Sequence, residues 1–246
     1  ERAVPAETRQ LESGLQHSLH ADRPGWWFRL ESWFLGAGVA PFVEFFQRNG
    51  TWAILILSFI GLYRLSDITM GIMANPFYLD LGFSKTDIAN VGKLYGFVMT
   101  LVGSFLGGLL VVRYGIFRPL FAGAVMVALT NLLFVKLALV GADLTWLAVA
   151  ISGDNLSGGF ANAAFIAYLS SMTNRAYTAT QYAFLTSFMA FSRDVLAASS
   201  GVLAERVDWI TFFVITAILA LPALVILIWM MRRYGSEPAG TESRAD

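Results

Sequence analysis

Six long apolar stretches, each about the length needed to cross a bilayer, dominate this chain of 246 residues. A transmembrane helix needs about 20 predominantly apolar residues at about 1.5 Å of rise per residue. The stretches cover approximately residues 51–75, 86–112, 117–140, 144–172, 177–203 and 209–233. Hydrophobic residues make up 57% of the chain and charged residues only 14%, unlike the balance in soluble domains. The sequence therefore predicts an all-α membrane protein, built as a six-helix transmembrane bundle.

Composition divides the remainder of the chain into three segments around a bundle at 48–233. Residues 1–24 are polar and predict a linker, and residues 234–246 predict a polar cytoplasmic tail. Residues 25–47 mix aromatic with charged side chains and contain Pro41, a composition typical of an amphipathic segment in the lipid headgroup layer. The alternative for this segment is a soluble linker that folds onto the bundle.

Residues with a strong positional preference mark the ends of the predicted helices. The capping signals are the pairs Ser84 with Asp87 and Thr178 with Gln181, and the single residue Asp208. Each places a side-chain oxygen where it can accept from a free backbone N–H of the first helical turn. Pro76 and Gly82 are expected to close the first loop.

Basic residues are distributed unequally over the predicted loops. Those on the side of the two termini are Arg48, Arg113, Arg118, Arg175, Arg232 and Arg233, and those on the opposite side are Lys85, Lys136 and Arg206. Cytoplasmic loops of membrane proteins carry an excess of Lys and Arg. The distribution therefore predicts that both ends of the chain are cytoplasmic.

Ionisable side chains inside the apolar stretches are the strongest indication of function. They are Arg64, Asp67, Lys93, Asp154, Arg193 and Asp194. Each would cost about 2.5–3.5 kcal/mol if it faced lipid, so most must pair or line a water-filled cavity. Asp67 and Lys93 reach similar depths on consecutive helices, which predicts an ion pair, and Arg64 and Asp67 are i, i+3 neighbours on one face.

Asp154 lies in the middle of its apolar stretch, beside two amides and the pair Gly158-Gly159. An acid at this depth can take up and release a proton during a transport cycle, so Asp154 is the first candidate for a proton carrier and Asp67 the second. The predicted substrate or proton pathway comprises Asp154, Asp67, Lys93, Arg64, Arg193, Asn155 and Asn162. The alternative is that these charges only hold helices together, although buried ion pairs stabilise poorly.

Small residues form a second pattern. Gly96, Thr100, Gly103 and Gly107 follow one another at spacings of four, three and four, which places them in a stripe that permits close approach of a neighbouring helix. Packing alone is sufficient to explain this stripe. The pair Gly158-Gly159 can let its helix bend, let a substrate approach the backbone, or serve ordinary packing.

Several kinds of chemistry find no support in the sequence. The chain has no cysteine, and its two histidines, His17 and His20, lie in the polar first segment, so we expect no metal site, no cofactor and no thiol or histidine catalysis. The formal net charge is zero, which gives no basic surface for nucleic acid. The chain shows no residue spacing that would indicate a membrane-embedded enzyme. A non-transporting scaffold subunit remains an alternative.

Four strings of residues resemble a known group of transporters. GLLVVRYGIFR at 108–118 resembles the second-half loop motif of the major facilitator superfamily, with matches at Gly108, Arg113, Gly115 and Arg118 and with Val112 in place of the acid. The other three strings resemble the C-terminal half of the AmpG muropeptide permease family. They are PFVEFFQRNGTWAILILSFIGLYRLSD ending at Asp67, KLYGFVMTLVGSFLGG from Lys93, and TATQYAFLTSF from Thr178.

The resemblance implies a bacterial inner-membrane transporter that imports anhydro-muropeptides, products of cell-wall turnover, driven by proton entry. Its implied partners are membrane lipid, the solute and protons, and the alternatives are permeases for siderophores or acetyl-coenzyme A. Members of the superfamily place the site between two six-helix bundles. We therefore expect this chain to be a C-terminal half whose N-terminal six-helix half is missing, or a half that pairs with another bundle, and alone it should not transport.

Overall fold

The structure, a computed structural model, describes residues 39–174 and 177–234. Every regular element in these residues is a helix. The predicted linker at 1–24, most of the aromatic segment at 25–47, the predicted tail beyond Tyr234, and Arg175 all lie outside the described residues.

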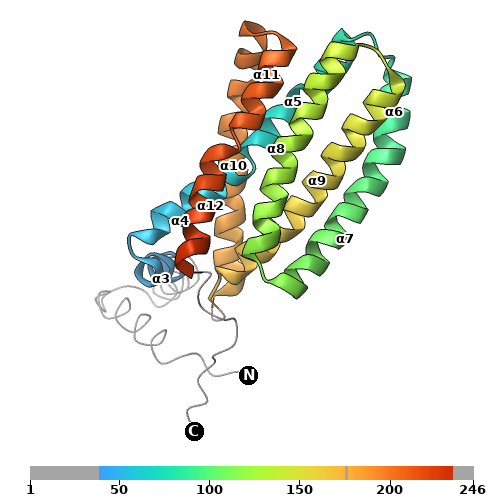
Figure 1. Cartoon of the computed structure of the whole chain (residues 1–246). Helices are drawn as coiled ribbons and strands as arrows, with labels where there is room; N and C mark the ends of the chain where they lie inside the picture. Colours follow the sequence, from blue (N-terminus) through green and yellow to red (C-terminus); the bar gives the residue numbers. More distant parts are fainter. Residues whose placement is uncertain (1–38, 175–176, 235–246) are drawn as a thin grey trace, which may run out of the picture. The chain divides into compact units, whose positions relative to one another are not determined.

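Helical structure covers each of the six apolar stretches (Figure 1). The helices are α3 (Ala40–Asn49), α4 (Trp52–Tyr63), α5 (Leu65–Asp80), α6 (Lys85–Val91), the π-helical turn η2 (Gly92–Gly96), α7 (Phe97–Tyr114), α8 (Phe117–Val140), α9 (Leu144–Ser171), α10 (Thr178–Arg206), α11 (Trp209–Ile218) and α12 (Leu221–Tyr234). The first stretch is divided between α4 and α5, the second between α6, η2 and α7, and the last between α11 and α12.

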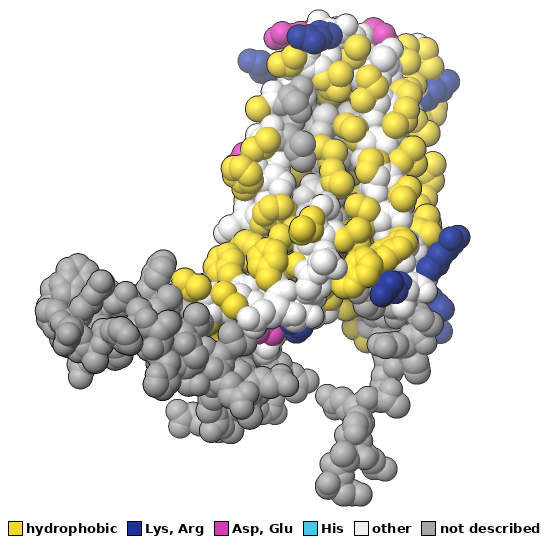
Figure 2. All heavy atoms as spheres, turned by 90° about the vertical axis from the view of Figure 1, so that its left-hand side faces the viewer, with side chains coloured by type: hydrophobic (Ala, Val, Ile, Leu, Met, Phe, Trp, Pro, Cys, Tyr) yellow, Lys and Arg dark blue, Asp and Glu magenta, His cyan; other side chains and the backbone are white. Residues whose placement is uncertain are grey.

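Four helical segments of the described chain are long and apolar enough to cross a membrane. They are Trp52–Asp80, Phe97–Tyr114, Phe117–Val140 and Trp209–Arg233. On the face shown in Figure 2, hydrophobic side chains are spread along the described surface, and Lys and Arg side chains lie near its upper and lower edges. This is a helical membrane protein. α9 and α10 are 28 and 29 residues long, and the total of six crossings stays a prediction.

The chain divides into two compact units. Of the described residues, the smaller unit contains those in 39–58, 169–174 and 177–188, and the larger contains those in 59–168 and 189–234. α4, α9 and α10 each contribute residues to both. All of the predicted pathway residues belong to the larger unit.

A buried hydrogen-bond network joins α3 to the start of α10 in the smaller unit. The side-chain amide of Gln181, which is 1% exposed, donates to the carboxylate of Glu44 and to the carbonyl oxygen of Pro41. Its amide oxygen accepts from the backbone N–H of Asn174 at 2.6 Å. The predicted capping box of Thr178 with Gln181 is therefore wrong, because the Gln181 side chain binds residues outside its own helix.

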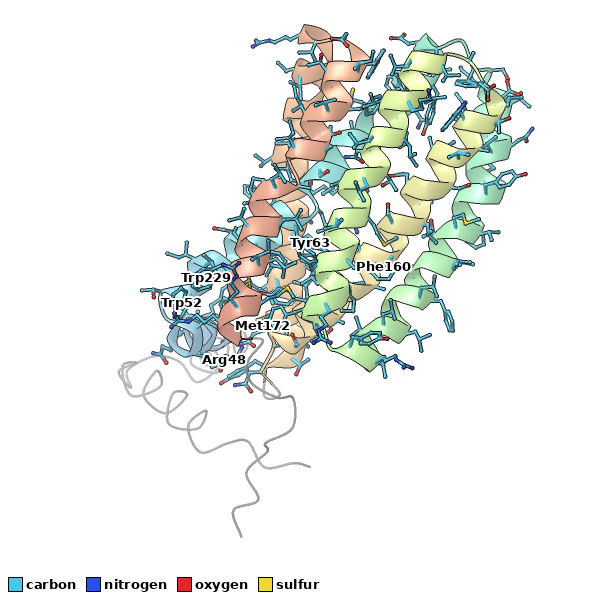
Figure 3. All side chains as sticks on the ribbon, in the orientation of Figure 1. Arg48, Trp52, Tyr63, Phe160, Met172 and Trp229 are labelled. Atoms are coloured by element: carbon cyan, nitrogen blue, oxygen red, sulfur yellow. The ribbon has the colours of Figure 1, made fainter. Side chains whose placement is uncertain are left out.

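Arg48 extends this network from the last turn of α3. It forms an ion pair with Glu44, with 3.3 Å between Nε and Oε1, and donates to the carbonyl oxygen of Met172 (Figure 3). Phe45 is fully buried, while Phe46 is 42% exposed. The described part of the aromatic segment thus has one face packed on protein, and its location in the headgroup layer stays a prediction.

The first apolar stretch is longer than predicted. Its helix runs to Asp80 and contains Pro76, so the prediction that Pro76 belongs to the first loop is wrong. A proline removes one backbone donor, and membrane helices tolerate this when their surroundings satisfy the freed carbonyl. The chain turns only at Gly82, whose φ of +94° is accessible to glycine at little cost.

Two of the predicted helix caps are confirmed. Ser84 and Asp87 form a capping box in which the N–H of Asp87 donates to the Ser84 hydroxyl and the N–H of Ser84 donates to the Asp87 carboxylate. Asp208 accepts from the backbone N–H of Thr211 at 3.1 Å and from its hydroxyl at 2.7 Å. These caps end the loops that precede α6 and α11.

The small-residue stripe of α7 packs directly on α9, which lies beside it in Figure 1. A Cβ added at Gly103 would lie 2.1 Å from the carbonyl oxygen of Leu156, and one at Gly107 would lie 2.6 Å from that of Phe160. In the reverse direction, a Cβ at Gly159 would lie 2.4 Å from a carbonyl oxygen of α7. The predicted close approach is confirmed, and only glycine permits it at these positions.

Replacing Gly103 with alanine is expected to lower the thermal unfolding temperature, because the new methyl group must push α7 away from α9. Forced overpacking of this kind costs about 1–3 kcal/mol. Gly108→Ala is the matched control on the same helix, since nothing lies within 4 Å of a Cβ there and alanine favours helix by about 1 kcal/mol over glycine. Unfolding in detergent measures both variants, and an unchanged midpoint for Gly103→Ala would contradict the close approach.

Asp208 provides a test of helix capping. Hydrogen bonds from the Thr211 hydroxyl and backbone N–H hold the pKa of the Asp208 carboxyl below its ordinary value. A lowered folded-state pKa means that the stabilisation is present above the unfolded-state pKa, about 3.9, and is lost as the pH falls through the folded-state pKa. Asp208→Ala should therefore unfold at a lower temperature than wild type at pH 7, and this difference should shrink in acid. A difference that does not change between pH 7 and pH 3 would contradict a charged cap.

Candidate functional site

The structure sorts the seven predicted pathway residues into three places. Arg64, Asp67 and Asn162 come together where α4, α5 and α9 meet. Lys93, Asp154 and Asn155 line one cleft. Arg193 is exposed on α10 and joins neither group in the described contacts.

Arg64 is the centre of the first group. Its guanidinium forms an ion pair with Asp67 and donates a hydrogen bond of 3.0 Å to the side-chain oxygen of Asn162. The pairing of Arg64 with its i, i+3 neighbour is confirmed, whereas the predicted ion pair between Asp67 and Lys93 is absent from the described residues. The local pair prevails because Arg64 lies one turn away and its planar fork suits a carboxylate.

Asp154 lies one helical turn from this group. A Cβ added at Gly158, four residues after Asp154, would lie 3.7 Å from Oδ1 of Asp67. Asp154 interacts electrostatically with Asp67 and Arg64, and with Tyr78 of α5. Oδ1 of Asp154 is buried, and no donor among the described residues reaches it. A buried polar atom without a partner is costly, and protonation of the carboxylate lowers this cost by removing its charge.

Asn155, the next residue, points to a different neighbour. Its side-chain oxygen accepts from the Thr100 hydroxyl at 3.0 Å, and its amide donates to the carbonyl oxygen of Ile151 at 2.8 Å. A Cβ at Gly96 would lie 3.1 Å from the same amide. Asn155 therefore fixes α9 against the η2–α7 segment, whereas Asn162 serves Arg64.

A cleft of about 570 Å³ opens between α5, the α6–η2 segment and α9. Its polar lining consists of Asn75, Tyr78, Lys85, Lys93, Asp154 and Asn155. In the part of the chain that the structure describes, no group of three or more His, Cys, Asp or Glu residues could hold a metal ion. The cleft thus offers ammonium groups, amides, a phenol and one carboxyl group to a bound solute.

The π-helical turn η2 places Lys93 at this cleft, and sequence analysis did not predict it. π-helical turns inside α-helices are rare and occur frequently at functional sites. Gly92 and Gly96 bound the turn, and glycine is a poor helix former. The two glycines that flank Lys93 in an apolar stretch were the available indication of an irregular helix here.

Sequence analysis also missed a buried polar node that joins α5, α8 and α11. The amide of Asn131 donates to the hydroxyl of Ser66 at 3.0 Å and to that of Thr216 at 3.2 Å. The Ser66 hydroxyl in turn donates to the backbone carbonyl of Thr216 at 2.7 Å. All three residues are at most 1% exposed, so the node positions α5, which carries Asp67. Uncharged polar residues within apolar stretches were the missed indication.

Arg113, Gly115 and Arg118 of the loop motif lie at the junction of α7 and α8, and Gly108 lies inside α7. Gly115 ends α7 with a φ of +77°, and the Arg113 guanidinium lies 5.5 Å from the ring centre of Tyr114. Arg118 is exposed in the first turn of α8, and a Cβ at Gly108 would meet nothing within 4 Å. A functional role for this motif stays a prediction.

Comparison with known proteins identifies one family. Residues 42–246 match the Major Facilitator Superfamily. The chain is 35% identical over 201 residues to a relative from Rickettsia conorii, 37% identical over 175 residues to one from Rickettsia felis, and 33% identical over 188 residues to one from Rickettsia prowazekii. Each relative is named "Putative transporter AmpG", with the number 4, 1 or 3 respectively.

The matches cover most of this chain but only part of each relative. They include 82%, 71% and 76% of this chain, and 48%, 40% and 45% of the Rickettsia conorii, Rickettsia felis and Rickettsia prowazekii proteins. The chain thus spans about half the length of the curated relatives that it matches.

A double-mutant cycle tests the pair at the centre of the first group. Arg64→Gln and Asp67→Asn should each destabilise the protein, because each leaves an opposite charge without its partner in a part-buried position. The double variant should lose less than the sum of the single variants, with a coupling free energy of about 1–3 kcal/mol. Chemical unfolding in detergent measures the cycle, and strictly additive losses would show that the two side chains are not coupled.

Proposed function

This chain belongs to the Major Facilitator Superfamily, and on that premise we propose that it forms half of a proton-coupled secondary transporter for anhydro-muropeptides. It acts in the bacterial inner membrane, with both of its ends cytoplasmic. Its partners are membrane lipid, the solute, protons and an N-terminal six-helix half. The observation that carries the proposal is the buried, donor-free carboxylate oxygen of Asp154, whose residue lines a cleft together with Lys93.

Asp154 suits the role of proton carrier better than Asp67 does. Asp67 is held in an ion pair by Arg64, so its charge is already compensated. Asp154 has no ion-pair partner among the described residues, and its Oδ1 has no donor. The negative charge of Asp154 is thus less compensated by neighbouring groups than that of Asp67. Protonation of Asp154 therefore changes the electrostatics of the site more than protonation of Asp67 does.

The proposed solute follows from the family resemblance and from the chemistry of the cleft. The AmpG names of the relatives favour muropeptides over siderophores or acetyl-coenzyme A as the solute class. An anhydro-muropeptide carries sugar hydroxyls, amides and carboxylates, and the cleft carries groups that complement each of them. Alternating access in this superfamily requires two bundles, so transport is assigned to the full protein and not to this half alone.

Replacing Asp154 with asparagine in the full-length protein is expected to abolish solute-driven proton uptake, because an amide of nearly the same shape cannot carry a proton. The protein should fold, since no donor is lost at Oδ1. The measurement is internal acidification of proteoliposomes on addition of anhydro-muropeptide.

Asp194→Asn is the matched control, because Asp194 is an exposed acid on α10 outside the cleft. This variant should couple proton and solute as wild type does. Undiminished proton uptake in Asp154→Asn would remove Asp154 from the mechanism. Transport that survives neutralisation of Arg64, Asp67, Lys93 and Arg193 alike would instead favour a scaffold role for the charged residues.

A further inference from the structure

We propose that Lys93 binds a carboxylate group of the solute in the cleft, and that Asp154 competes with this carboxylate for the ammonium group of Lys93. The inference rests on the proposed function and deepens it in two ways. It names the chemical group that the cleft recognises, and it links proton and solute through one shared cation.

The structure leaves Lys93 as the available base at this depth. Sequence analysis offered three bases, but Arg64 is occupied by Asp67 and Asn162, and Arg193 is exposed on α10 outside the cleft. Lys93 lines the cleft and forms no ion pair within 4 Å among the described residues. A cation that faces a cleft without a counter-ion there is suited to bind an anionic group.

The other donor groups of the cleft also favour an anionic ligand. Lys85 supplies a second ammonium group from the first turn of α6, and Asn75 and Tyr78 supply an amide and a phenol from α5. All of these can donate to a carboxylate. With two lysines and one acid, the cleft carries an excess of positive charge that favours an acidic solute over a cationic one.

Asp154 shares this cleft, and its surroundings limit what else can compensate it. The groups that interact with it electrostatically are Arg64 at the N-cap of α5, and Asp67 and Tyr78 within α5. Lys85 of α6 and Lys93 of η2 line the same cleft. The polar groups that bond to this part of α9 from α7 and α8 are hydroxyls, that of Thr100 to Asn155 and that of Thr130 to Ser157. Because Arg64 already pairs with Asp67, the lysines are the uncommitted cations.

The competition gives the direction of coupling. When Asp154 is ionised, it attracts the Lys93 ammonium group and repels a solute carboxylate. When Asp154 is protonated, both effects vanish and Lys93 is free to bind the solute. A proton and a carboxylate therefore bind with positive cooperativity, and by linkage each raises the affinity for the other.

The test is uptake of labelled anhydro-muropeptide by proteoliposomes that contain the full-length protein, with two unlabelled competitors. One competitor is the same solute, and the other has its carboxylates converted to carboxamides. For wild type, the carboxamide should compete about tenfold less well than the free acid, as expected for the loss of one charged contact. The apparent affinity for the free acid should rise as the external pH is lowered from 8 to 6.

Variants assign the effect to named side chains. Lys93→Gln should lose about tenfold in apparent affinity and no longer distinguish acid from carboxamide, whereas Lys93→Arg should keep the distinction. Lys136→Gln is the matched control, since Lys136 lies on α8 over the ring of Trp146 and outside the cleft. Asp154→Asn should bind the solute with an affinity that no longer depends on pH.

Each outcome decides between the two proposals. Equal competition by acid and carboxamide in wild type, or normal discrimination in Lys93→Gln, overturns the carboxylate site while leaving muropeptide transport intact. An unchanged pH dependence of affinity in Asp154→Asn overturns the competition. Absence of any uptake by wild type overturns the proposed function and, with it, this inference. The competitor comparison needs no variant, so it decides the matter even if Lys93→Gln fails to fold.

Discussion

Inside a bilayer no water is available to satisfy polar groups, so each must find its partner within the protein. α9 shows how this requirement organises the larger unit. Ser157 bonds Thr130 of α8, Asn155 bonds Thr100 of α7, and Asn162 accepts from Arg64. Three polar side chains thus fix the helix to three different neighbours. Asp154 departs from this pattern, because one of its carboxylate oxygens is buried without a donor among the described residues, and a departure of this kind marks a place where a ligand or proton completes the structure.

The cleft depends on the close packing of α7 and α9. Glycines at the contact let the two backbones approach closely, and Asn155 then lies directly against Gly96 at the end of η2. The π-helical turn ends where this contact begins, and it carries Lys93 into the same cleft as Asp154. Packing and chemistry are therefore connected: the stripe of small residues serves packing, and the packing sets which charges share a cavity.

Sequence information predicted those features that follow from local periodicity and local hydrogen bonding. The helical ranges, the Ser84 and Asp208 caps and the α7 stripe each depend on residues within one or two turns of each other. Apart from Pro76, which lies inside α5 and not in a loop, the failures concern choices between a local and a distant partner. The sequence offered two basic partners for Asp67, and the structure pairs it with Arg64. Gln181 was predicted to complete a capping box, but its side chain donates to Glu44. The sequence alone does not show which of two possible partners a side chain binds, because this depends on how the helices approach one another in three dimensions.

The two groups of charges form one electrostatic system. The Asp67 carboxylate lies beside Gly158, and Gly158 is one helical turn from Asp154 on α9. Arg64, Lys85 and Lys93 carry three positive charges, and Asp67 and Asp154 carry two negative charges, which gives a net charge of one positive unit when both acids are ionised. Proton entry at Asp154 raises the net charge to two positive units in a medium where uncompensated charge is expensive. A solute carboxylate offsets the added positive unit, and departure of either ligand alone removes this balance. Charge balance in a cavity of low dielectric thus gives a physical reason for proton and acidic solute to move together.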